Sequence, residues 1–235
     1  MSYLLFLLGG ISPVEVYLLE SLSHEYSPKN IFIIGNAFGW STIVMALCFP
    51  NAKIVALDAG VEGKDNMQGI ELTNHIANEE GFNTIVEYGF SPQNTKEIVE
   101  KHFGNEKIDF VFIDGLHTNE QLLKDFYGVL DFCHKETLFL YHDVINWKME
   151  KAFMEIKDYL TNYNSMLLYR TTSGMGVSMP KSISSDIQNV FLSFTENQQY
   201  VDILKKSLTT KAKIRGFIGR FLPKFIKENI KRMLG

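Results

Sequence analysis

Short, almost wholly apolar runs alternate with segments of helical periodicity along most of this chain, and this alternation limits the fold more than any other feature. The runs are NIFIIG, AKIVALDAG, TIVEYG, IDFVFIDG and TLFLYHDV, which begin at residues 30, 52, 84, 108 and 137. Because each run is nearly continuously apolar, each is expected to be a strand covered on both faces. Strands of this kind separated by helices form a parallel sheet. We therefore predict a doubly wound α/β domain over residues 28–180.

The segments between these runs carry apolar residues at spacings of three and four, which is typical of helices. A proline at a helix-start position opens the first of them, over residues 13–24, and Pro50 closes the helix that begins at Ser41. The stretches SMLLYR and GMGVSM are predicted to complete a mostly parallel, seven-stranded sheet as a pair of strands. Residues 1–27 are expected to form a helical cap or lid, and residues 181–235 a helical extension.

Charge and cysteine content limit the partners and the compartment. The net charge of −4 is uneven, because residues 211–235 hold eight Lys and Arg against one Glu, so the other 210 residues carry −11. An acidic body argues against nucleic-acid binding, which needs a basic surface. Cys48 and Cys133 give no disulfide framework, and the apolar start MSYLLFLLGG lacks both a signal peptide's basic residues and the length of a membrane span. We therefore expect a cytoplasmic protein.

Sheets of this class bind ligands at the carboxyl ends of their strands, so the residues there are the first candidates. The first strand ends in GNAFGWST, where Gly35 and Gly39 permit positive φ and the close approach of a ligand to the backbone. A tight turn without a ligand is the alternative. The second strand ends in Asp58, 23 residues after Gly35. Nucleotide-binding folds place a ribose-binding carboxylate at a spacing of roughly 20 residues, whereas Asp58 as a simple cap is the other interpretation.

Four ionisable side chains follow the fourth and fifth strands: Asp114, His117, His142 and Asp143. These strands are expected to be neighbours, about 4.8 Å apart, so the four groups should share one space. Two carboxylates and an imidazole can hold a hard divalent cation, which leaves His117 to take a proton. The alternatives are helix capping by the aspartates and a hydrogen-bonded histidine with no chemical role.

These stretches resemble the class I S-adenosylmethionine-dependent methyltransferases, in particular the small-molecule O-methyltransferase branch with its catechol-type, sugar-modifying and macrolide-modifying members. The similarity covers about residues 10–180. IFIIGNAFGWST looks like the family's first motif, FVFIDGLHTNEQLLKDF with LFLYHDV is the most specific portion, and TTSGMGVSM is similar to the closing hairpin. The resemblance implies a Rossmann-like methyltransferase fold and S-adenosylmethionine as the cofactor.

The resemblance also implies a set of cofactor-binding residues. Asp58 stands where the family's ribose-binding acid stands, and YGFSPQN lies at the adenine edge of the expected site. The chain departs from the branch at Ile33, where an acid usually precedes the first-motif glycine by two residues. The full set of expected cofactor residues is Gly35, Asn36, Phe38, Gly39, Ser41, Thr42, Asp58, Phe90, Ser91 and Asp114.

The catalytic residues implied by the resemblance are His117 and Asp114, because catechol-type members carry a basic residue three positions after the strand-four aspartate. The implied metal ligands are Asp114, His142 and Asp143, for Mg²⁺ or another divalent cation. Here the chain departs from the branch again, since an Asp-Asn pair stands where this sequence has His142-Asp143.

The expected reaction is methyl transfer to a hydroxyl of a small-molecule or glycan acceptor. Short-chain dehydrogenases need Tyr-x-x-x-Lys and nicotinamide-binding folds need G-x-G-x-x-G at the first turn; neither occurs here. The Asn/Asp-Pro-Pro-Tyr of amino-methylating enzymes is replaced by Ile-Asp-Gly after the fourth strand. A methyltransferase-like domain that only binds a partner stays open as the alternative.

Residues 214–234 place apolar side chains at helical spacing and Lys or Arg on the other face, with a break expected at Pro223. This is the pattern of a basic amphipathic tail. It suits peripheral contact with the anionic inner face of a membrane, and it equally suits packing on the chain's own domain or on a second subunit in a homo-oligomer.

Overall fold

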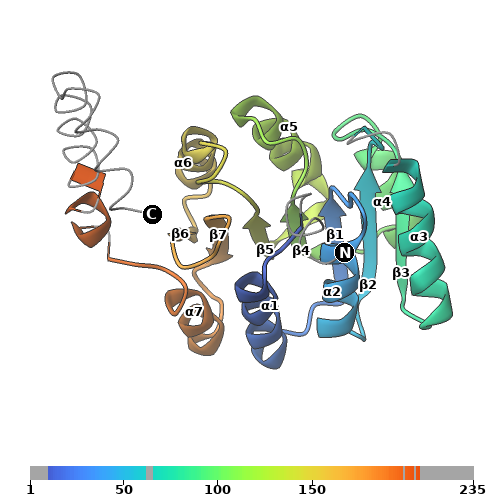
Figure 1. Ribbon diagram of the computed structural model, residues 1–235, viewed down its shortest axis with the longest axis horizontal. Coiled ribbons are helices and arrows are strands. Elements are labelled where there is room, and N and C mark those ends of the chain that lie inside the picture. The colour runs from blue at the N-terminus through green and yellow to red at the C-terminus, as the bar shows by residue number, and fades with distance from the viewer. Residues whose placement is uncertain (1–9, 62–65, 198, 204, 207–235) are drawn as a thin grey trace, which may run out of the picture. The chain divides into compact units, whose positions relative to one another are not determined.

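The computed structural model describes residues 10–61, 66–197, 199–203 and 205–206 (Figure 1). The chain divides into two compact units, residues 1–195 and 196–235. In the second unit, residues 199–203 and 205–206 are helical, and the basic amphipathic tail lies outside the described residues. No helix in the described ranges combines the length and the apolar character needed to cross a membrane.

A seven-stranded sheet forms the centre of the first unit, in the order β3-β2-β1-β4-β5-β7-β6. Its first five strands pair in parallel, whereas β7 is antiparallel to both β5 and β6. This confirms the predicted mostly parallel, doubly wound sheet and its closing pair of strands. The strands are β1 (Asn30–Ile34), β2 (Lys53–Asp58), β3 (Thr84–Tyr88), β4 (Ile108–Ile113), β5 (Cys133–Tyr141), β6 (Tyr163–Leu168) and β7 (Met175–Pro180).

Helices cover both faces of the sheet. In Figure 1, α5 and α6 lie on one side and α1, α2 and α7 on the other. The helices are α1 (Pro13–Glu25), α2 (Trp40–Cys48), α3 (Asn66–Glu79), α4 (Thr95–Phe103), α5 (Asn119–Val129), α6 (Glu150–Tyr159) and α7 (Ser185–Leu192), with a short 3-10 helix η2 (Leu130–Phe132) after α5.

The two hydrophobic cores explain why the central strands are apolar at nearly every position. Ile31 and Ile33 of β1 point into the core under α1 and α2, whereas Phe32 and Ile34 point into the core under α4, α5 and α6. All residues of β1 are buried. A strand buried on both faces has no solvent-facing side on which a polar residue would be favoured.

Two elements differ from the pattern expected from the sequence. β5 begins at Cys133, four residues before the predicted run, because it continues through polar residues at the amino end of the sheet. The predicted helical region after residue 181 contains α7, and residues 195–197 are then not helical.

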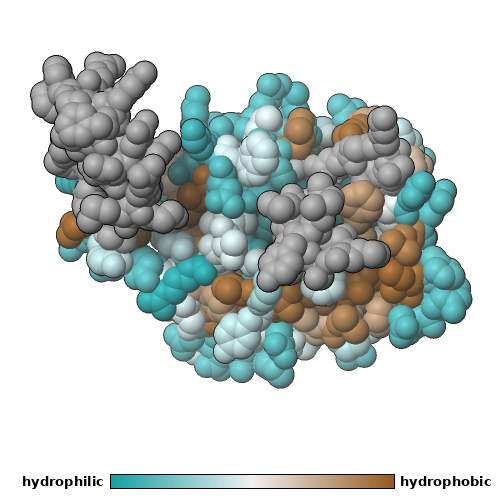
Figure 2. Space-filling model, viewed as in Figure 1, coloured by the Kyte–Doolittle hydropathy of each residue, from teal (hydrophilic) through white to brown (hydrophobic). Residues whose placement is uncertain are grey.

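Apolar side chains gather over α2 and α3 on the face shown in Figure 2. The large exposed side chains of these helices include Trp40, Leu47, Met67 and Leu72. Trp40 opens α2 and donates its indole N–H to the carbonyl oxygen of Ile11 at 3.0 Å. The segment leading into α1 is thereby fixed beside the turn that follows β1.

Candidate functional site

The turn after β1 requires glycine at two positions. Gly35 has a φ of 97°, and a Cβ there would lie 2.1 Å from the backbone carbonyl oxygen of Asp114. Gly39 has a φ of 87°, and a Cβ there would lie 1.9 Å from Oγ1 of Thr73 on α3. Both glycines therefore serve a left-handed conformation and a close approach of neighbouring elements. The turn presents bare backbone at the carboxyl edge of the sheet.

Asp58, the last residue of β2, holds this turn in place. Its Oδ2 accepts the backbone N–H groups of Asn36 at 2.6 Å and Ala37 at 2.9 Å, and its Oδ1 accepts that of Gly60 at 2.7 Å. An ionised carboxylate has about four acceptor positions, so Asp58 keeps capacity for a further donor. The position of Asp58 suits both the interpretation as a cap and the interpretation as a ligand-binding carboxylate, because Asp58 caps its own loop and also lines a pocket.

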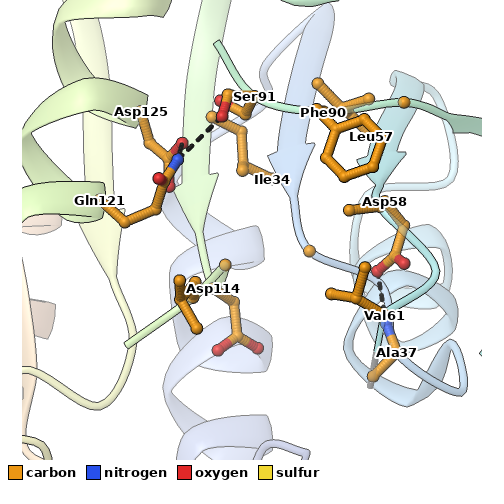
Figure 3. A pocket seen from close by; sticks show the side chains of 15 residues that line it. Ile34, Ala37, Leu57, Asp58, Val61, Phe90, Ser91, Asp114, Gln121 and Asp125 are labelled. Atoms are coloured by element: carbon orange, nitrogen blue, oxygen red, sulfur yellow. Dashed lines mark hydrogen bonds between the residues drawn. The ribbon is translucent and has the colours of Figure 1, made fainter. Parts of the chain in front are cut away.

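A pocket of about 260 Å³ opens at the carboxyl ends of β1, β2 and β4 (Figure 3). The predicted cofactor residues on its wall are Gly35, Asp58, Phe90, Ser91 and Asp114. Figure 3 shows Asp58 and Asp114 on different sides of this space, with Ser91 toward the far end from Asp114. The pocket therefore has Asp58 and Asp114 on different sides, at the ends of β2 and β4.

The other predicted cofactor residues have supporting positions. Thr42 donates its hydroxyl to the side-chain oxygen of Asn36 at 2.8 Å, and Asn36 donates to Thr73 Oγ1 at 3.2 Å. These contacts connect the turn to α2 and α3. Within the described part of the chain, five predicted residues stand outside the pocket lining: Asn36, Phe38, Gly39, Ser41 and Thr42.

Gln121 and Asp125, two α5 residues for which no role was predicted from the sequence, also line the pocket. They lie beside Ser91, away from Asp114 (Figure 3). The Gln121 side-chain amide donates to Asp125 Oδ1 at 2.7 Å and to the carbonyl oxygen of Ser91 at 2.8 Å. Burial raises the pKa of Asp125 to about 6. Their spacing of four residues places both on one helix face.

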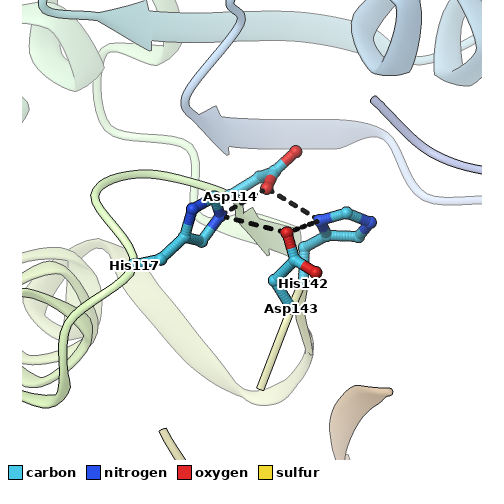
Figure 4. A group of neighbouring side chains, drawn as sticks. All are labelled: Asp114, His117, His142 and Asp143. Carbon is cyan, nitrogen blue, oxygen red and sulfur yellow. Dashed lines mark hydrogen bonds and ion pairs between the residues drawn. The ribbon is translucent and has the colours of Figure 1, made fainter. Parts of the chain in front are cut away.

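Four side chains meet where β4 and β5 end: Asp114, His117, His142 and Asp143 (Figure 4). One ligand atom from each lies within 4.8 Å of all the others. The sheet register explains this, because Ile113 pairs with Tyr141, so that the residues directly after them, Asp114 and His142, stand side by side. We refer to these four side chains as the Asp-His centre.

Distances within the Asp-His centre are short. His142 Nδ1 lies 2.9 Å from Asp114 Oδ1 and 3.4 Å from Asp143 Oδ2. His117 Nε2 lies 3.3 Å and 3.5 Å from the same two oxygens. Each histidine therefore directs one nitrogen at both carboxylates.

Electrostatic coupling inside the centre is strong. Burial alone would raise the pKa of Asp114, but the charge of His142 and the contact with His117 lower it to about 2. Burial alone would lower the pKa of His117, but Asp114 and Asp143 raise it above its usual value. The pKa of His142 is raised well above its usual value by the charge of Asp114, against the opposing effect of burial. The imidazoles and the carboxylates thus favour each other's charged forms, and a dication can take over the role of the imidazolium charge when the histidines are neutral.

The donor set fits a metal ion. Among the described residues, neither imidazole nitrogen of His142 has a partner in hydrogen-bonding geometry, although Nδ1 lies 2.9 Å from Asp114 Oδ1. Buried polar atoms without hydrogen bonds are rare in proteins and often mark a site for an ion or water. Asp143 has a φ of 56°, a conformation that is uncommon outside glycine and often found at functional sites.

An aromatic side chain borders the centre. The indole of Trp147 stacks on the His117 imidazole with ring centres 5.4 Å apart and planes 15° from parallel. Trp147 is 60% exposed, so part of this surface is open to solvent. The indole limits the positions that the His117 ring can take.

Residues 32–144 match a family model described as "Methyltransferase domain". The matched range contains the turn after β1, Asp58, the pocket wall and all four side chains of the Asp-His centre. This part of the chain is similar to a methyltransferase domain. With its seven strands and antiparallel β7, the first unit has the class I fold, the fold of S-adenosylmethionine-dependent methyltransferases. No curated protein matches this chain by sequence.

Solved structures of methyltransferases share the fold of the first unit. An O-methyltransferase from Bacillus cereus in complex with SAH has a TM-score of 0.60 at 18% identity, covering 76% of this chain and 86% of that one. The O-methyltransferase TomG from Streptomyces achromogenes, involved in tomaymycin synthesis and solved with SAM, has a TM-score of 0.57 at 16% identity, covering 73% and 81%. A methyltransferase from Geobacter sulfurreducens has a TM-score of 0.55 at 13% identity, covering 73% and 82%.

Proposed function

We propose that this methyltransferase domain transfers a methyl group from S-adenosylmethionine to a hydroxyl oxygen of a small-molecule or glycan acceptor, with the assistance of a divalent cation. The observation that carries the proposal is the position of Asp114, which lines the pocket and also belongs to the Asp-His centre. A cofactor in the pocket and an acceptor at the centre would therefore meet at this residue. Holding two reactants in line supplies much of the rate of such a transfer.

The pocket wall supports the cofactor assignment. Gly35 lets the cofactor lie against backbone, and the remaining acceptor capacity of Asp58 suits a ribose hydroxyl. Phe90, which is 46% exposed, offers an apolar face to the base. Gln121 and Asp125 bring hydrogen-bonding groups to the same end of the pocket.

In the Asp-His centre, Asp114, His142 and Asp143 would hold the cation, which when bound lowers the pKa of a coordinated acceptor hydroxyl. His117 lies at the edge of the group, with its side chain 20% exposed. Once the two carboxylates are engaged by another charge, the interactions that raise the pKa of His117 weaken. Its Nε2 can then accept the proton that the acceptor hydroxyl loses.

His117→Ala is expected to lower turnover by about 100-fold or more, because general-base catalysis typically contributes a factor of that size. The dissociation constant for S-adenosylmethionine should stay unchanged, because the pocket lining does not include His117. Turnover assays and calorimetric titration with the cofactor and its demethylated product measure both quantities. His134→Ala is a matched control, since His134 forms a comparable pair with Asp109, at 2.9 Å, at the opposite end of the sheet. Wild-type turnover in His117→Ala would remove His117 as the base.

A binding domain without catalytic activity is the second candidate. It is favoured by Ile33, which is fully buried where the branch carries an acid near the cofactor's amino group, and by His142 in place of an aspartate. The same titration separates the two candidates. A domain that only binds a protein partner should give no heat with either S-adenosylmethionine or its demethylated product.

We further propose that residues 211–235 hold the protein at the anionic inner face of a membrane from the cytoplasmic side, where a lipid-linked glycan could be the acceptor. The support is the density of basic residues on an amphipathic pattern. The full chain is expected to float with vesicles that contain anionic lipid and to stay at the bottom with neutral vesicles. A chain ending at residue 210 should stay at the bottom in both.

Sedimentation of the same two proteins tests the alternative contact. If both float equally but only the full chain sediments as a dimer, the tail is a subunit contact and the membrane proposal is wrong.

A further inference from the structure

Glu15 is a buried carboxylate that the reaction outlined above does not use. It is 1% exposed, and it comes from the first turn of α1, far from the strand ends in sequence. Its Oε2 accepts the backbone N–H of Ser12 at 2.7 Å, and its Oε1 accepts that of Ser173 at 2.8 Å. The capping box with Ser12 accounts for one of these bonds and for the start of the helix. It does not account for the deep burial of a charged group.

The partner that compensates this burial is His142. Glu15 Oε2 lies 3.5 Å from His142 Nε2, and the His142 side chain is 4% exposed. Burial alone would raise the pKa of Glu15, but its interactions with His142 and Ser173 lower it to about 2. Removing one partner of a buried ion pair strongly destabilises the folded protein, because the other charge is left buried and unpaired. Glu15 therefore faces the nitrogen of His142 that points away from the Asp-His centre.

The two nitrogens of His142 have separate environments as a result. Nε2 faces Glu15, and Nδ1 faces the oxygens of Asp114 and Asp143. A carboxylate beside one nitrogen of an imidazole favours a proton on that nitrogen, so the lone pair is on the other nitrogen. In histidine ligands of metal ions, such a carboxylate also fixes the ring orientation and raises the basicity of the coordinating nitrogen.

We infer that Glu15 is a positioning residue that keeps the proton of His142 on Nε2 and presents Nδ1 to the cation, and that this nitrogen makes the centre select a transition-metal dication over Mg²⁺. The inference rests on the proposed function for the presence of a cation at the centre. Imidazole suits ions such as Co²⁺ and Zn²⁺, whereas Mg²⁺ prefers sites made of oxygen ligands alone. With His142 in place of one aspartate of an all-oxygen set, the preference therefore shifts from Mg²⁺ toward transition-metal dications. Glu15 strengthens this shift, because it orients the His142 ring and raises the basicity of Nδ1.

Cation titrations of the full chain test this after treatment with a chelator. Wild type is expected to bind Co²⁺ at least about 100-fold more tightly than Mg²⁺, with a visible Co²⁺ spectrum typical of nitrogen coordination. Glu15→Gln should weaken Co²⁺ binding by about 10- to 100-fold, the usual effect of losing a carboxylate behind a histidine ligand. Its Mg²⁺ affinity should stay nearly unchanged. His142→Asp should reverse the preference toward Mg²⁺.

Two controls separate positioning from folding. Glu106→Gln removes an exposed glutamate that pairs with Lys29 and should change neither affinity. In Zn²⁺-loaded wild type, ¹⁵N NMR should show His142 protonated at Nε2 and not at Nδ1, a result that needs no variant to fold.

The outcomes are distinct. Equal affinity of wild type for Co²⁺ and Mg²⁺, a proton on Nδ1 of the Zn²⁺ form, or unchanged Co²⁺ binding in a folded Glu15→Gln would each overturn the inference and leave the proposed function standing. Failure of the wild type to bind either cation would overturn the metal-assisted reaction together with the inference. Calorimetry with S-adenosylmethionine on the same sample then shows whether methyl transfer itself is still supported.

Discussion

Gly35→Ala is expected to lower the free energy of unfolding by about 4 kcal/mol, the sum of left-handed strain and overpacking, and to abolish cofactor binding. At a φ of 97°, the new Cβ would lie 2.1 Å from the carbonyl oxygen of Asp114 and 2.6 Å from its carbonyl carbon. Both are backbone atoms at the end of β4, so neither can rotate away. β1 and β4 would have to separate at the residue that joins the pocket to the Asp-His centre.

Urea unfolding of wild type and Gly35→Ala measures the loss, and calorimetry measures cofactor affinity. Gly81→Ala is the matched control, because Gly81 has a φ of 68° with nothing within 4 Å of its would-be Cβ. That variant carries the backbone strain without the collision and should lose only about 1 kcal/mol. Equal losses in the two variants would contradict the argument from close approach.

Asp125→Asn is expected to stabilise the protein at neutral pH by about 3 kcal/mol, because a pKa raised from 3.8 to about 6 represents a penalty of that size for the ionised form. The folded state binds the proton of Asp125 more tightly than the unfolded state does. The free energy of unfolding of wild type should therefore fall as the pH rises from about 4 to about 6. At higher pH the ionised carboxylate imposes the full penalty, and the free energy of unfolding stays at its lower value. Asparagine avoids the penalty, and its oxygen can still accept the Gln121 amide.

Unfolding of wild type and Asp125→Asn at a series of pH values checks this sign. The difference in stability should be small near pH 4, grow up to about pH 6 and then stay constant. Asp158→Asn, which removes an exposed carboxylate from α6, controls for the change in net charge. A difference that is the same at every pH would contradict the proposed cause. Weaker cofactor binding by Asp125→Asn would show that the buried carboxylate is retained for binding in spite of its effect on stability.

The fold was predictable because its determinants are local. Residues 31–34 of β1 each face one of two cores, so the strand shows as an apolar run, and the helices between such runs show their own period. The meeting of Asp114 with His142 followed from the adjacency of β4 and β5 alone. Because the strand order places β4 beside β5, the residues that follow these strands in the sequence are neighbours at the carboxyl edge of the sheet.

The parts of the site that depend on packing between distant elements were not predictable. Glu15 has the sequence signature of a helix-start residue, and nothing near it marks the contact with His142. Gln121 belongs to an ordinary amphipathic helix until the pocket shows which face it occupies. The hydrogen bond from Thr42 to Asn36 was likewise not predictable, because a motif gives the order of residues and not the direction of each side chain.

Trp147 gives the protein a built-in optical probe. The chain has two tryptophans, and Trp40 is bonded to Ile11 rather than to the Asp-His centre. In a Trp40→Phe protein, all tryptophan emission would come from the indole stacked on His117. A charged imidazole quenches a neighbouring indole, so each gain or loss of charge on that ring would change the brightness of one fluorophore and could be followed in real time.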